Sequence, residues 1–72
     1  MNRNEIPKGF TMAQNIEQWH VGYVFEWSPV FEGWVDTLSR ISVRPNESVG
    51  AAYYRQKGLM PPNMEIFLRE SF

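Results

Sequence analysis

The segment from Ser28 to Ser42, SPVFEGWVDTLSRIS, constrains the fold most, because its apolar and polar residues fall on opposite sides of a helical wheel. Ser28 is a good N-cap, and Pro29 fits the first helical position, where a missing N–H is tolerated. A strand is the alternative, but the adjacent pair Trp34-Val35 breaks the two-residue alternation that a strand requires. The pattern predicts a central amphipathic helix over 29–41, whose inward face consists of Val30, Phe31, Trp34, Val35, Leu38 and Ile41.

The length and the absence of cysteine limit how this chain can be stabilised. A chain of 72 residues forms one small domain, and without cysteine it relies on packing alone. Aromatic residues make up 15% of the chain, and each buried ring removes about 150 to 250 Å² from water. The sequence contains no long apolar run and no basic start followed by an apolar stretch. We expect a single domain over 1–72 in a reducing, cytoplasmic setting, with no membrane association.

The residues before the central segment divide into an arm and an alternating stretch. Residues 1–10 mix Asn, Pro and Gly with charges, which predicts a flexible arm. Thr11 followed by Gln14 is a capping-box pattern that predicts a short helix. From Trp19 to Trp27 large apolar residues alternate with others, which predicts a strand over 19–27, with one continuous helix as the alternative.

The residues after the central segment predict a second helix and a closing strand. Pro45 stops the regular pattern, Asn46 is a reasonable N-cap and Gly58 suits the position after a helix, so a helix is predicted over 46–57. The segment 64–70 alternates as a strand that could pair with 19–27, or forms a helix capped by Asn63. The predicted fold is a helix-rich α+β domain, with a small all-α bundle as the alternative.

Side chains that carry chemistry are few. His20 is the single histidine, so a zinc or iron site would need mainly carboxylates. Glu32 and Asp36 are four residues apart, but on the polar side of the predicted helix, where solvated surface is the simpler interpretation. The glycines are isolated from one another, so no phosphate-binding loop is present. We therefore predict no enzymatic activity, no cofactor and no metal.

One short stretch resembles a known family. Tyr53 to Pro62, YYRQKGLMPP, resembles the end of the first helix-turn-helix in the MerR family of transcription regulators, where a Gly-Leu-x-Pro turn leads into a wing. The resemblance implies a helix in the DNA major groove, with Tyr53 and Tyr54 on the backbone. It covers 10 of 72 residues, and Ala52 stands where the family usually has arginine. Because a glycine C-cap followed by proline gives the same letters, we base no family assignment on it.

The two halves of the chain differ in charge, although the net charge is −1. Residues 1–39 hold two cations and five carboxylates, whereas residues 40–72 hold five cations and three carboxylates. This asymmetry leaves nucleic acid as a candidate partner, through a weak basic face made by Arg44, Arg55, Lys57 and Arg69.

The composition favours action by binding. Trp, Tyr and Arg are enriched at interface hot spots, and the chain holds more aromatic side chains than so small a core readily encloses. We predict a non-enzymatic protein that binds another macromolecule, most readily a protein, as an inhibitor or accessory factor encoded by a mobile element. The alternatives are a DNA-binding, helix-turn-helix-like regulator and a minor subunit of an assembly; a homo-oligomer would also bury the rings. The candidate partner-binding residues are Trp27, Tyr54, Arg55, Lys57, Phe67, Arg69 and Phe72.

Overall fold

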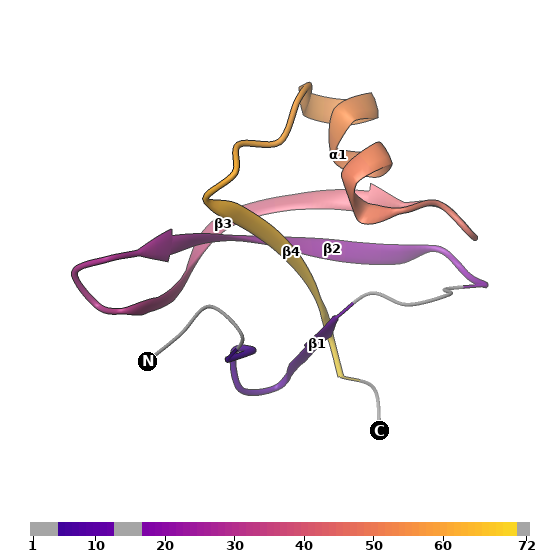
Figure 1. Cartoon of the computed structure of the whole chain (residues 1–72). Helices are drawn as coiled ribbons and strands as arrows, with labels where there is room; N and C mark the ends of the chain where they lie inside the picture. The colour runs from indigo at the N-terminus through magenta and orange to yellow at the C-terminus, as the bar shows by residue number, and fades with distance from the viewer. Residues whose placement is uncertain (1–4, 13–16, 71–72) are drawn as a thin grey trace.

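The domain is a four-stranded antiparallel sheet with one short helix. The computed structural model describes residues 5–12 and 17–70. The strands follow the order β1-β4-β2-β3 across the sheet. Strands make up 47% and the helix 15% of the described residues, so the helix-rich α+β prediction and its all-α alternative are wrong. Along the chain the elements are β1 (Phe10–Met12), β2 (His20–Ser28), β3 (Gly33–Val43), α1 (Val49–Lys57) and β4 (Met64–Arg69) (Figure 1).

The predicted central helix over 29–41 is a β-hairpin turn followed by most of β3. Ser28 does cap a turn, since its Oγ accepts from the Phe31 N–H at 3.3 Å, but Glu32 then adopts a left-handed φ of 53° and the chain reverses. In β3, three residues, Thr37 to Ser39, lie opposite Val24 alone, because Tyr23 pairs with Arg40 and Phe25 with Asp36. This bulge interrupts the two-residue alternation of inward and outward side chains in β3. The spacing of the apolar residues in β3 therefore resembles that of a helix.

The other elements agree better with the sequence. The strand predicted over 19–27 is β2, and the strand predicted over 64–70 is β4, which pairs with β2 from Tyr23↔Phe67 to Glu26↔Met64. The helix predicted over 46–57 begins later, because its N-cap is Ser48, whose Oγ accepts from the Ala51 N–H. Thr11 belongs to β1 and not to a helix; Gln14 lies outside the described residues.

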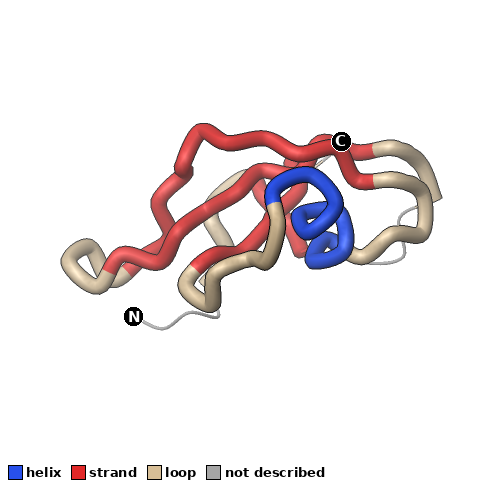
Figure 2. Tube along the Cα trace, turned by 90° about the horizontal axis from the view of Figure 1, so that it is seen from above, coloured by secondary structure: helices blue, strands red, loops and turns tan. Residues whose placement is uncertain are grey.

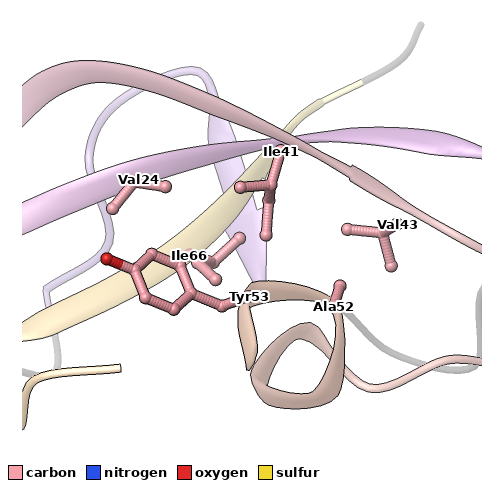
Figure 3. Close-up of a cluster of buried hydrophobic side chains, with 6 residues drawn as sticks. All are labelled: Val24, Ile41, Val43, Ala52, Tyr53 and Ile66. Carbon is pink, nitrogen blue, oxygen red and sulfur yellow. The ribbon is translucent and has the colours of Figure 1, made fainter. Parts of the chain in front are cut away.

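The main core lies between the sheet and α1. Ile41 and Val43 of β3 pack beside Val24 and Ile66, and all four side chains are at most 2% exposed. The helix covers this face with Ala52 and Tyr53, and the close-up in Figure 3 shows their side chains directed toward the strands. Seen from above, α1 lies over one end of the sheet and leaves the β2–β3 turn uncovered (Figure 2).

The opposite face of the sheet is aromatic. Edge-to-face contacts with ring centroids 5.0 to 5.6 Å apart join its rings into one continuous cluster. Such pairs stabilise beyond the area that they bury. Strand β4 therefore buries Ile66 against α1 and Phe67 against the aromatic cluster, which explains its nearly continuous apolar sequence. We define the aromatic cluster as Phe10, Tyr23, Phe25, Trp27, Trp34 and Phe67.

Candidate functional site

The predicted partner-binding residues do not form one surface. The expectation that Phe67 is exposed is wrong: it is 2% exposed and packs between the rings of Phe25 and Trp34. Trp27 is half-buried against Trp34, at a centroid distance of 5.4 Å. Tyr54 is exposed on α1. Phe72 lies outside the described residues.

The predicted basic face is also divided. Arg69 lies at the end of β4 opposite Phe10 and holds its guanidinium 5.5 Å from that ring. Arg44 precedes α1, and Lys57 ends it. The helix-turn-helix that the MerR resemblance implies requires two helices, and α1 is the single helix of residues 5–12 and 17–70.

Arg55 is part of the framework. Its guanidinium donates to both carboxylate oxygens of Glu47, at 2.8 and 3.1 Å, and to the backbone oxygen of Ser42 at 3.0 Å. Glu47 also accepts from the backbone N–H of Arg44 at 3.1 Å. Together these bonds connect β3, the loop before α1 and the last turn of α1, so Arg55 holds the helix in place.

The same bonds make Glu47 unusually acidic. The Arg55 guanidinium, aided by the Arg44 N–H, lowers the pKa of Glu47 to about 2. A carboxyl whose pKa is lowered by folding stabilises the folded state above its unfolded pKa of 4.5, and this contribution is lost as pH falls through about 2. We expect Arg55→Met to unfold at a lower urea concentration than the wild type at pH 7. The difference between the two urea midpoints should become smaller as the pH falls from 4.5 to 2.

The direct readout of this effect is an NMR titration of the Glu47 side-chain carboxyl carbon. The midpoint should lie near 2 in the wild type and move up toward 4.5 in Arg55→Met. Asp36, whose pKa is lowered by its own partner Arg40, serves as the internal control and should not move. An ordinary Glu47 midpoint in the wild type would mean that this ion pair does not form in solution.

Two highly exposed apolar side chains lie next to each other at the turn between β2 and β3. Val30 is 89% exposed and Phe31 76% exposed, and the two are adjacent. The turn projects at the left end of the molecule in Figure 1, beyond the body of the sheet. We call Val30 and Phe31 the hairpin tip. Sequence reasoning missed it because the helical wheel placed these residues on the inward face.

The stem below the hairpin tip is held rigidly. The Trp27 N–H donates to the backbone oxygen of Asn63 at 2.8 Å, and Asn63 Nδ2 donates to Glu26 at 3.1 Å. These bonds attach β2 to the loop that precedes β4. On the other strand, the Trp34 ring lies between those of Trp27 and Phe67. The hairpin tip therefore extends from a stem fixed by packing and by hydrogen bonds.

Metal-ligating side chains are not brought together in the described part of the chain. No group of three or more His, Cys, Asp or Glu is placed there to hold a metal ion. None of its helices has the length and apolar character needed to cross a membrane. Comparisons with protein-family models, with curated proteins and with solved structures found no match.

Proposed function

We propose that this protein acts without catalysis, by binding another protein through the hairpin tip, and so serves as an inhibitor or accessory factor of its partner. The observation that carries the proposal is the exposure of Val30 and Phe31, which are adjacent at a turn whose stem is held by hydrogen bonds and ring contacts. Single exposed apolar residues are ordinary on protein surfaces. Two adjacent exposed apolar residues at a projecting turn are less common. Together their side chains can fill a pocket on a partner protein.

The free energy available from burying these two side chains supports this interpretation. Complete burial of a Val or Phe side chain stabilises by about 1.5 to 3 kcal/mol. The fold gains almost none of this from either residue of the hairpin tip. Rigid presentation also lowers the ordering cost that a flexible loop would pay on binding. The hairpin tip thus has the apolar area and the order expected of an anchor at the centre of an interface.

The test is capture of the partner by tagged protein from a lysate of the source cell or its host. The double substitution Val30→Ser and Phe31→Ser should reduce the captured protein at least tenfold, because burying two apolar side chains contributes several kcal/mol to binding. The melting temperature should be nearly unchanged, since neither side chain packs in the fold.

The matched control is Leu59→Ser, which removes an 85% exposed apolar side chain from a different loop. It should leave capture intact. Nuclease treatment and a high-salt wash separate protein partners from nucleic acid, whose binding weakens steeply with salt. A partner retained equally by the wild type and the double variant would exclude the hairpin tip as the binding surface.

A further inference from the structure

A side chain hydrogen-bonds the outward-facing backbone groups of β3 in the way that a neighbouring strand would. The Ser42 N–H donates to Oε1 of Gln56 at 3.0 Å, and the Ser42 backbone oxygen accepts from Nε2 of Gln56 at 2.7 Å. Because β3 is the last strand of the sheet, these backbone groups face away from β2. The Gln56 carboxamide therefore makes the two hydrogen bonds that the N–H and C=O of one residue in an added antiparallel strand would make.

The Glu47 carboxylate bonds the next outward backbone group along the same edge. We call the Gln56 carboxamide and the Glu47 carboxylate together the cap. Glu47 accepts from the N–H of Arg44, two residues beyond Ser42, and the same carboxylate binds Arg55. The cap thus offers β3 one carboxamide and one carboxylate. These are the groups that an extended acidic peptide would offer, its backbone to Ser42 and its side chain to Arg55.

The rest of the β3 edge is closed in another way. At the bulge, Asp36 Oδ1 accepts from the Leu38 N–H at 2.8 Å, and Thr37 Oγ1 accepts from the Ser39 N–H at 3.2 Å. Bulges of this kind prevent strand pairing. Strand addition is therefore restricted to the end of β3 from Arg40 and to the following Arg44, where Ser42 is bonded to Arg55 and Gln56 of the last turn of α1.

The charges near this edge of β3 indicate which kind of strand could pair with it. The sequence from Arg40 to Lys57 contains four cations and the single carboxylate Glu47. A second copy pairing about Ser42 would place Arg40 of one chain opposite Arg44 of the other, and like charges directly opposite are destabilising. A strand bearing carboxylates meets the opposite situation. Arg40 holds Asp36 at 2.9 Å and Arg55 holds Glu47 at 2.8 Å, so both guanidinium groups already bind carboxylates that an incoming carboxylate would replace.

We propose that the Arg40–Arg44 edge of β3 is a strand-addition site for an extended acidic segment of another protein, and that Gln56 and Glu47 occupy this site until such a segment binds. The backbone N–H and C=O of one incoming residue replace the Gln56 carboxamide, and an incoming carboxylate replaces Glu47 on Arg55. This site is separate from the hairpin tip, so either assignment can fail without the other.

The test is an NMR titration of the whole chain with two capped pentapeptides, Glu-Val-Glu-Val-Glu and Lys-Val-Lys-Val-Lys. The acidic peptide should shift the amide signals of Arg40, Ser42 and Arg44, and the basic peptide should not. Gln56→Ala should bind the acidic peptide about tenfold more tightly, because the two Gln56 hydrogen bonds to Ser42 no longer compete and only the Arg55 bond to the Ser42 oxygen remains there. Leu59→Ser, outside the site, should bind like the wild type.

Ser42→Pro supplies the complementary variant. It removes the outward N–H, proline is tolerated on an edge strand, and acidic-peptide binding should be lost. Equal binding of the two peptides by the wild type would overturn the proposal without reference to any variant. The proposal would also be overturned if the Gln56→Ala variant self-associated and did not bind the acidic peptide. The cap would then serve only to prevent pairing between copies of this chain.

Discussion

Phe67→Ala is expected to lower the free energy of unfolding by about 3 to 5 kcal/mol, the usual cost of deleting a buried aromatic ring together with the cavity that remains. Phe67 is 2% exposed and contacts the rings of Phe25 and Trp34. A domain of this length has a total stability of roughly 4 to 11 kcal/mol, at 0.05 to 0.15 kcal/mol per residue. The variant should therefore be close to unfolding at 25 °C, as measured by urea denaturation.

Phe31→Ala is the matched control for this substitution. The same atoms are removed, but Phe31 is 76% exposed at the hairpin tip, so the urea midpoint should change little. If Phe31→Ala destabilised the domain as much as Phe67→Ala does, the hairpin tip would have to be packed in solution. Its role as a binding surface would then be wrong.

Gly22→Ala is expected to destabilise the domain by about 1 to 3 kcal/mol, as overpacking of a core does. A Cβ at this position would lie 2.8 Å from Ile66 Cγ2, 2.9 Å from Ile41 Cγ1 and 3.3 Å from Val43 Cγ2. All three side chains are at most 2% exposed, so they cannot move aside without disturbing the core. Thermal unfolding of the variant measures the loss.

Gly50→Ala should have the opposite sign. A Cβ at Gly50 meets nothing within 4 Å, and the residue lies in α1, where alanine is favoured over glycine by about 1 kcal/mol. The melting temperature should therefore rise for Gly50→Ala and fall for Gly22→Ala. Two shifts of the same sign would contradict the packing of the α1 face of the sheet.

Local sequence signals identified the strands and the helix whose patterns are regular. The alternation from Trp19 to Trp27 corresponds to β2, and the pairing expected between that strand and the one over 64–70 is present. The prolines and Gly58 marked the limits of α1 to within a few residues, because backbone restrictions act locally.

The segment 29–41 could not be predicted in this way, because its pattern results from tertiary structure. A bulge at Thr37–Ser39 is stabilised by the Thr37 hydroxyl, which donates to the Val24 backbone oxygen at 2.7 Å, and by Asp36, which accepts from the Leu38 N–H. Leu38 adopts a left-handed φ of 68° there and is 78% exposed. No helical wheel anticipates an apolar residue in such a conformation.

The candidate sites were predicted incompletely for the same reason. Exposure of Tyr54 was anticipated, whereas the hairpin tip was assigned to the core and Phe67 to the surface. Residue type alone cannot tell whether Arg55 faces a partner or a carboxylate of its own chain. Its pairing with Glu47 depends on the loop before α1 folding back, which no spacing in the sequence reveals.

The central claim, that the hairpin tip contacts a partner protein, is tested most directly by photo-crosslinking. A benzophenone side chain would replace Phe31, and in a parallel sample Leu59, in protein expressed in the source cell or its host. Both positions are exposed, so the probe should leave the fold intact at either one. We expect one discrete crosslinked protein from position 31 and none from position 59. The same crosslinks from both positions, or none from position 31, would contradict the assignment of the hairpin tip as the binding surface.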